Sequence, residues 1–190
     1  MDITTLVGQC RKGDALAWEL LVTRFQGRIY GLAYHYIGNA EEARDLAQDI
    51  FIRIYNRLDS CTNEKTFVPW MLRVARNMCI DRLRRRKARP PMSGVPVDEM
   101  THLQADTLDP AEEFQLSSRK KLVHTALRKL SEINREIIVL KEIQGLSLEE
   151  ISKMLKLPIG TVKSRSNRAR IQLARQVLEM AGRNTEGTGD

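Results

Sequence analysis

The stretch from residue 144 to residue 177 constrains the fold more than any other part of the chain. Ser147 can cap a helix, and Glu150 three residues later can complete a capping box. Apolar residues then recur at helical spacing up to Pro158, which removes a backbone donor and disfavours α geometry in the residue before it. A second helix is expected from about Ile159. The pattern therefore predicts a helix-turn-helix.

The second helix of this motif has two distinguishable faces. The expected buried stripe steps by four, three and four residues through Val162, Ser166, Ala169 and Leu173. Another face carries Thr161, Ser164 and Arg168, flanked by Lys163, Arg165, Asn167, Arg170 and Arg175. Small polar groups followed by bases suit a helix that enters the major groove of DNA. The alternative for this stretch alone is an αα-hairpin with a solvated basic face.

The formal net charge of +7 is distributed unevenly along the chain. Residues 1–89 carry 16 Lys/Arg and 10 Asp/Glu, whereas residues 114–190 carry 15 and 8. Residues 90–113 carry 6 acids and neither Lys nor Arg. Two basic modules joined by an acidic segment are the charge pattern expected of a protein that binds a polyanion.

Helical periodicity is present on both sides of the acidic segment, without strand-like alternation. We expect helices over residues 2–10, 15–37, 40–58, 67–87, 112–130 and 132–143 before the helix-turn-helix. Asn39, Thr66 and Ser131 are the expected N-caps. The helix over 15–37 should bury a stripe of Leu16, Leu20, Leu21, Phe25, Ile29, Leu32 and Ala33. Trp70 should pack in the core.

The predicted fold is all-α, with two small helical domains joined by a flexible acidic linker. The expected segments are an N-terminal helical domain (1–88), a Pro-rich acidic linker (89–112), a C-terminal helix-turn-helix domain (113–181) and a disordered tail (182–190).

No catalytic set, metal site or signal segment is predicted. Cys10, Cys61 and Cys79 are scattered, without a CxxC pair or a His at ligand spacing, so reduced thiols are expected. The first residues contain no apolar run long enough for a signal or a spanning helix. We therefore expect a cytoplasmic protein that is not an enzyme, needs no cofactor and does not insert into a membrane.

Three segments in a fixed order resemble a known family. They are ARDLAQDIFIRIY (43–55), FVPWMLRVARNMCIDRLRRR (67–86) and LSLEEISKMLKLPIGTVKSRSNRARIQL (146–173), with the acidic spacer before the last. In these segments the chain resembles a bacterial sigma factor of the extracytoplasmic-function group, in the sigma-70 family. The resemblance runs from about Ala17 to Leu173, except in the linker. It implies that the chain binds core RNA polymerase, directs it to promoters and is controlled by an anti-sigma factor.

The resemblance also implies a polymerase-binding helix. In the family, the helix that matches residues 40–58 docks on the clamp helices of the polymerase β′ subunit. The matching positions here are Asp45, Leu46, Gln48, Asp49, Phe51, Ile52 and Arg53. Carboxylates, an amide and partly exposed apolar groups suit a protein partner better than a phosphate.

The family's −10 module matches the loop Ser60–Thr66 and the helix over residues 67–87. In the family this module opens the −10 element and captures a flipped base of the melted non-template strand, as extruded-base recognition requires. The matching positions are Ser60, Cys61, Thr62 and Asn63 in the loop, and Arg76, Asn77, Asp81, Arg84 and Arg85 on the helix.

The helix-turn-helix matches the module that reads the −35 element as duplex DNA in the major groove. The candidate base contacts are Thr161, Ser164, Asn167 and Arg168. The candidate phosphate contacts are Lys141, Lys163, Arg165 and Arg170, together with backbone amides around Gly160 and Thr161.

Two other functions remain open at this point. The chain could be a stand-alone helix-turn-helix regulator, in which residues 1–110 would form a sensor or dimerisation domain. It could also be a sigma mimic that titrates an anti-sigma factor, although such a mimic need not keep DNA-reading side chains such as Arg168 and Lys163.

Overall fold

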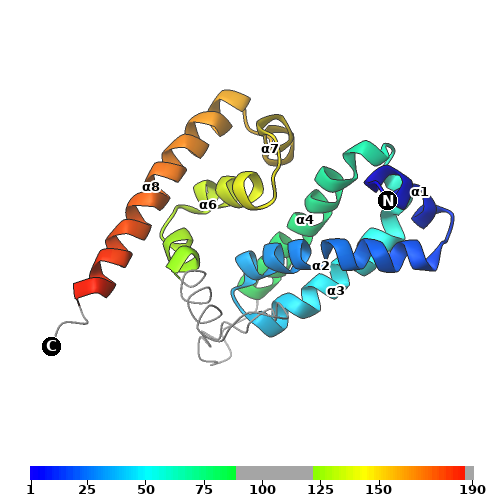
Figure 1. Cartoon of the computed structure of the whole chain (residues 1–190), viewed down its shortest axis with the longest axis horizontal. Helices are drawn as coiled ribbons and strands as arrows, with labels where there is room; N and C mark the ends of the chain where they lie inside the picture. Colours follow the sequence, from blue (N-terminus) through cyan, green and yellow to red (C-terminus); the bar gives the residue numbers. More distant parts are fainter. Residues whose placement is uncertain (89–121, 187–190) are drawn as a thin grey trace. The chain divides into compact units, whose positions relative to one another are not determined.

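The computed structural model describes residues 1–88 and 122–186 (Figure 1). Every regular element within these two ranges is a helix, which confirms the predicted all-α class. The contacts divide the chain into two compact units, one containing residues 1–88 and the other residues 122–186. The expected linker, residues 89–112, lies outside the described residues.

The N-terminal unit contains four α-helices and two short 3-10 turns. These are α1 (Ile3–Arg11), α2 (Ala15–Ile37), α3 (Ala40–Arg57), η1 (Leu58–Ser60), η2 (Glu64–Thr66) and α4 (Phe67–Ala88). Side-chain oxygens of Asp2, Asp14 and Asn39 accept backbone N–H groups at the starts of α1, α2 and α3. The predicted cap at Asn39 is confirmed, with 2.9 Å from its Oδ1 to the amide of Glu42.

The core of the N-terminal unit lies where α2 packs on α1, α3 and α4. Leu21, Ile29 and Leu32 of α2 are fully buried, and the ring of Phe25 lies 5.8 Å from that of Phe67. The predicted burial of Leu16 and Leu20 is wrong, since they are 72% and 53% exposed. The buried row instead starts at Ala17, because positions 17, 21, 25, 29 and 33 step by four along one face.

The connection between α3 and α4 differs from the polar loop predicted there. It folds into η1 and η2, and Thr66 lies inside η2, where its hydroxyl donates to the backbone oxygen of Asn63 at 2.9 Å. The predicted N-cap role of Thr66 is therefore wrong. Trp70 in the first turns of α4 is half-buried and packs against Phe67, as expected of a core residue.

The C-terminal unit begins with helical residues 122–128. They are followed by α6 (Glu132–Ile138), a π-helical turn η3 (Val139–Ile143), α7 (Leu148–Leu155) and α8 (Ile159–Glu186). Ser131 is the N-cap residue of α6, as predicted, but its side chain makes no capping bond. Arg135 instead bonds the preceding turn, donating to the backbone oxygens of Arg128 and Leu130. Because α8 continues to Glu186, the tail expected from residue 182 does not begin there.

The predicted helix-turn-helix is confirmed in α7 and α8. The hydroxyl of Ser147 accepts the amide of Glu150 at 3.2 Å, and the Glu150 carboxylate accepts the amide of Ser147 at 2.7 Å. These two bonds form the predicted capping box. Lys156 ends α7 in the left-handed region at φ 55°. Two residues later Pro158 leads into α8 at Ile159.

The buried side of α8 is the stripe expected from its spacing. Val162, Ser166 and Ala169 are inaccessible or nearly so, and Leu173 packs on a cluster that Ala169 forms with Leu127, Leu130 and Ile138. Ser166 and Ala169 have small side chains, which let the backbone of α8 lie close to that of α6. The opposite side of α8 is left facing outward.

Candidate functional site

The outward face of α3 presents both charges and one large apolar side chain. Asp45, Gln48, Asp49 and Arg53 are exposed, and Ile52 between them is 60% exposed. Two residues predicted for this face, Leu46 and Phe51, are instead only 4% and 9% exposed. Leu46 lies one turn before Ile50 on the core stripe, so its side chain supports the face from beneath. The exposed part of the face that was predicted to bind polymerase is thus smaller than expected.

A groove of about 380 Å³ lies between α3 and α4. It is lined by Leu46, Asp49, Ile52, Arg53 and Asn56 from α3, and by Met78, Asp81, Arg82 and Arg85 from α4. Residues predicted to contact the polymerase therefore lie beside residues predicted to contact DNA. Asn56, Met78 and Arg82 were not among the predicted site residues, although each lies within four residues of one on its own helix.

A second, less polar pocket of about 460 Å³ borders the same face. Its walls include Trp18 at the start of α2, and Phe51, Ile52 and Tyr55 on α3. The rings of Trp18 and Tyr55 meet edge to face with centroids 5.0 Å apart. Sequence reasoning missed these two aromatic residues, because nothing in the spacing of α2 shows that its first turns border α3.

The outward face of α4 is polar and basic. Asn77, Asp81, Arg84 and Arg85 are exposed and Arg76 is half-buried, whereas Met71, Ala75 and Cys79 form the buried side. Asn77 and Asp81 are one turn apart, and Asp81 forms an ion pair with Arg84 at 3.8 Å. This pair is exposed and contributes little to stability. The geometry leaves the amide, the carboxylate and the arginines accessible to a partner.

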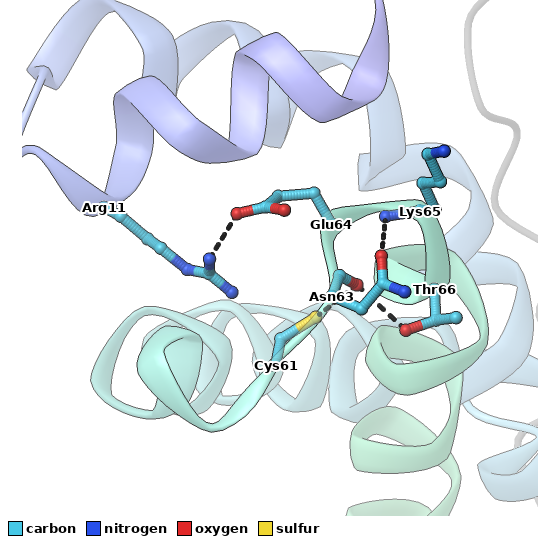
Figure 2. A network of polar contacts seen from close by, with 6 residues as sticks. All are labelled: Arg11, Cys61, Asn63, Glu64, Lys65 and Thr66. Carbon is cyan, nitrogen blue, oxygen red and sulfur yellow. Dashed lines mark hydrogen bonds and ion pairs between the residues drawn. The ribbon is translucent and has the colours of Figure 1, made fainter.

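The loop between α3 and α4 is bonded to itself at most of its polar groups (Figure 2). The Cys61 thiol donates to the backbone oxygen of Asn63 at 3.4 Å, and Ser60 donates to the backbone oxygen of Arg57 at 2.7 Å. Burial raises the pKa of the Cys61 thiol, so the group remains a protonated donor. Because Cys61 is 2% exposed, its predicted contact with a base is wrong.

Two of the residues predicted to contact a base in this loop, Thr62 and Asn63, keep polar groups that are not bonded within it. Thr62 and Asn63 are exposed, and the Asn63 side-chain oxygen accepts the amide of Lys65 at 2.9 Å. Asn63 therefore caps η2 with one end of its amide. Its NH2 group and the hydroxyl of Thr62 are left to contact a partner.

The outward face of α8 carries most of the residues predicted to contact duplex DNA. Lys163, Ser164, Asn167, Arg168 and Arg170 are exposed, Gly160 is exposed in the first turn, and Thr161 and Arg165 are half-buried. The Ser164 hydroxyl donates to the backbone oxygen of Thr161 at 3.1 Å. Lys141, half-buried in η3, lies 3.3 Å from the carboxylate of Glu142, which also holds Arg170. Glu142 was not predicted to take part.

Among residues 1–88 and 122–186, no helix is both long and apolar enough to cross a lipid bilayer.

Family models match both units of the chain. The model described as Sigma-70 region 2 matches residues 21–89, and that described as Sigma-70, region 4 matches residues 120–173. The first covers the helices that carry the α3 face, the loop and the α4 face. The second covers the helix-turn-helix.

Several curated proteins are similar over nearly the whole chain. The ECF RNA polymerase sigma factor SigW of Bacillus subtilis is 35% identical, over 95% of this chain and 99% of its own. The RNA polymerase sigma-H factor of Pseudomonas aeruginosa is 35% identical, over 87% of this chain and 88% of its own. The ECF RNA polymerase sigma-E factor of Escherichia coli K12 is 33% identical, over 94% of this chain and 95% of its own.

Solved structures share the fold. CnrH in complex with the cytosolic domain of CnrY has a TM-score of 0.64 at 25% identity, covering 91% of this chain and 95% of that one. The sigma factor RpoE in complex with the anti-sigma factor NepR from Bartonella quintana has a TM-score of 0.60 at 24% identity, covering 84% of this chain and 95% of that one. With two region matches in order and relatives of this identity over almost the full length, the chain belongs to the extracytoplasmic-function group of RNA polymerase sigma factors, in the sigma-70 family.

Proposed function

We propose that this sigma factor divides promoter recognition among three surfaces. The exposed face of α3 binds the clamp helices of core RNA polymerase. The loop of residues 60–66 and the outward face of α4 open the −10 element and hold its non-template strand. The outward face of α8 reads the −35 element as duplex. The observation that carries this proposal is the placement of Ser164, Asn167 and Arg168 on one exposed face of α8, opposite its buried stripe.

The α8 surface combines the two kinds of contact that a DNA-reading helix needs. Arg168 can donate two parallel hydrogen bonds to a guanine edge, and Asn167 can pair with an adenine edge in the same groove. Lys163 and Arg170 are exposed beside them and suit phosphates, which carry no sequence information. The first-turn amides near Gly160 add positive potential where a phosphate passes.

The α3 surface has the composition of a protein-binding face. Asp45 and Asp49 repel phosphates, whereas the exposed side chain of Ile52 offers apolar area to another protein. The pocket that Ile52 shares with Trp18 and Tyr55 extends this apolar area beside the charges. A partner that places basic and apolar side chains along one helix face is the best match, and family membership points to the clamp helices as that partner.

The α4 surface and the loop fit a melted strand better than a duplex. Arg84 and Arg85 supply charge for the backbone, and Asn77, Asn63 and Thr62 supply hydrogen-bonding groups for the edges of unstacked bases. The carboxylate of Asp81 on the same face disfavours a phosphate close to it. Ser60 and Cys61 are no longer proposed as base contacts, because the Ser60 hydroxyl donates to the backbone oxygen of Arg57 in α3 and the Cys61 thiol is buried and donates within the loop.

An anti-sigma factor is the regulatory partner that we infer for this chain. The inference rests on family membership and on the fold shared with RpoE, which was solved with the anti-sigma factor NepR. As a sigma factor the chain supplies recognition while the polymerase supplies the chemistry, so we propose a cytoplasmic, non-enzymatic role.

Promoter-dependent initiation with purified core polymerase tests the proposal. Arg168→Ala should lower initiation through loss of about 1–3 kcal/mol of −35 binding and should relax the base preference at one position. Asp49→Ala should instead lower the affinity for core polymerase on every promoter. Lys129→Ala and Glu19→Ala remove an exposed charge of the same sign elsewhere in each unit, and they should leave initiation unchanged.

Other outcomes would favour the competing functions. Wild-type initiation by both Arg168→Ala and Asp49→Ala would remove the site assignments. Specific duplex binding without polymerase, together with no initiation in its presence, would support a stand-alone regulator. Binding to an anti-sigma factor without any promoter-dependent initiation would support a sigma mimic.

A further inference from the structure

An ion pair joins the first helix to the loop between α3 and α4. Figure 2 shows Arg11 reaching from the end of α1 to the carboxylate of Glu64 at the start of η2. The partners are 53 positions apart in the sequence, and their side chains are only 24% and 31% exposed. A long-range pair that is mostly shielded from water is weakened less by salt than one on an open surface.

The loop has few other connections to the rest of the N-terminal unit through its polar side chains. Thr66, Lys65 and Cys61 all bond to Asn63, which makes Asn63 the centre of a network confined to the loop. These bonds fix the shape of the loop, and the buried side chain of Cys61 seats one end of it in the core. Glu64 supplies a polar contact that extends outside the network to α1. Burial raises the pKa of the Cys61 thiol, and Arg11 also lies near enough to this thiol to act to lower it.

Packing alone does not explain why an arginine is present at position 11. Its Nε and Nη2 atoms are buried and have no hydrogen-bond partner within the described protein. Burial of unpaired donors on a charged group destabilises a fold. An uncharged side chain of the same length would avoid this cost, so the ion pair with Glu64 is the evident reason for a charge at this position.

The anchoring of α1 does not depend on this pair. Leu6, Val7 and Cys10 of α1 are buried, and they hold the helix against the core through apolar contacts. Arg11 is the last residue of α1, next to this anchored part. The helix therefore provides a fixed point from which its terminal side chain holds Glu64.

We propose that Arg11 is a positioning residue for −10 recognition, which holds the loop through Glu64 so that Thr62 and Asn63 are presented to the melted strand. This inference rests on the proposed role of the loop in reading the −10 element. It assigns a part in promoter selection to α1, whose residues lie before the segment that the Sigma-70 region 2 model matches. Arg11 itself touches no DNA in this arrangement.

The test is initiation by the full chain with core polymerase on a promoter library randomised across the −10 element, read by sequencing the transcripts. Arg11→Gln and Glu64→Gln should each reduce the preference at the selected −10 position about fivefold, the upper range for a partly exposed ion pair. Lys12→Gln removes the neighbouring exposed charge and should keep the wild-type preference. The −35 preference should be unchanged in all three.

Two further variants separate positioning from a general loss of structure. Arg11→Lys keeps one charge-assisted bond to Glu64 and should restore most of the −10 preference. The double variant Arg11→Glu, Glu64→Arg reverses the pair and should do the same. Hydrogen exchange should show faster exchange at the amides of Lys65 and Thr66 in Arg11→Gln, with unchanged protection in α2 and α3.

A loop variant separates this inference from the proposed function. Thr62→Val combined with Asn63→Asp removes both presented donors but keeps an oxygen for the amide of Lys65. If this variant loses −10 preference while Arg11→Gln and Glu64→Gln keep it, the loop reads DNA and the positioning role of Arg11 is overturned. If all of these variants keep the wild-type preference, the role of the loop fails as well. If Arg11→Gln does not fold, the result with Glu64→Gln decides.

Discussion

The guanidinium of Arg170 in α8 donates to the carboxylate of Glu142 in η3 at 2.9 Å. Lys141 lies 3.3 Å from the same carboxylate oxygen. Lys141 and Arg170 were both predicted to contact DNA phosphates. In the free protein they are instead paired with the carboxylate of Glu142. Duplex DNA must compete with Glu142 for these two side chains.

Glu142→Gln should therefore increase affinity for −35 duplex DNA. Removing the carboxylate frees two bases and removes an anion from the DNA-facing side, so we expect a gain of about 3–10-fold at low salt. The slope of log affinity against log salt should become steeper. Fluorescence anisotropy of the holoenzyme on a −35 duplex measures both quantities, and Glu179→Gln, which removes an exposed carboxylate of α8, is a control. An unchanged affinity and slope would show that neither base reaches the backbone.

The same carboxylate gives this contact a pH dependence. Burial acts to raise the pKa of Glu142, but hydrogen bonds from Lys141 and Arg170 outweigh it and lower the pKa below the ordinary value of 4.5. The pairing thus contributes to stability above pH 4.5 and is lost as the pH falls through the depressed pKa. Glu142→Gln should remove this dependence from the melting temperature measured between pH 3 and pH 6, a range set by ordinary carboxyl values.

Ile52 and Phe51 should separate polymerase binding from stability. Ile52→Ala shortens a side chain that is 60% exposed, so the melting temperature should change little while affinity for core polymerase falls. Phe51→Ala empties a buried position and should destabilise the N-terminal unit by about 3–5 kcal/mol. Thermal melts and a pull-down with core polymerase measure the two effects. The assignment of the α3 face is wrong if Ile52→Ala binds core polymerase as the wild type does.

The three cysteines should react slowly in the native protein. Burial raises the pKa of all three thiols, and that of Cys79 rises to about 12. At pH 8 about one Cys79 side chain in ten thousand is then a thiolate, which is the reactive form. Alkylation followed by mass spectrometry should label Cys79 slowest, with rates that rise with pH. Denaturant should make the three rates similar, whereas rapid native labelling of Cys79 would mean that it is accessible.

Two serines that precede helices should differ in their effect on stability. Ser147→Ala removes one half of the capping box and should cost about 1 kcal/mol in the C-terminal unit. Ser131→Ala removes a side chain that makes no capping bond, and its effect should stay within about 0.5 kcal/mol. Chemical denaturation of the two variants tests the comparison, and equal losses would contradict it.

Sequence reasoning was most successful where a local signal decides the structure. Asn39 and Ser147 each precede a helix and bond the amide three residues later, as predicted. Both depend only on neighbours in the chain. The stripe of α8 was also predicted, because its buried residues recur without interruption and are flanked by bases that cannot be buried.

The predictions failed where contacts between distant segments decide the structure. Leu16 and Leu20 have the right spacing for a core stripe, yet the neighbouring row from Ala17 is the one that faces α3 and α4. Cys61 was predicted to contact a base and Thr66 to cap α4, but both side chains donate to the backbone oxygen of Asn63, in a loop whose fold the sequence did not indicate. The pairs of Arg11 with Glu64 and of Arg170 with Glu142 join residues 53 and 28 positions apart, a range that periodicity does not reach.

Lys156 lies between the two helices of the DNA-binding motif, at a positive φ that usually belongs to glycine. A lysine is strained in this conformation, because the right-handed and extended regions are more favourable for it. Bonds within the turn hold it there: the amides of Lys156 and Leu157 donate to the backbone oxygen of Ser152, and the Ser152 hydroxyl donates to the backbone oxygen of Leu157 at 2.6 Å. In the proposed complex, the angle at which α8 enters the groove is therefore set by the bonds of this turn.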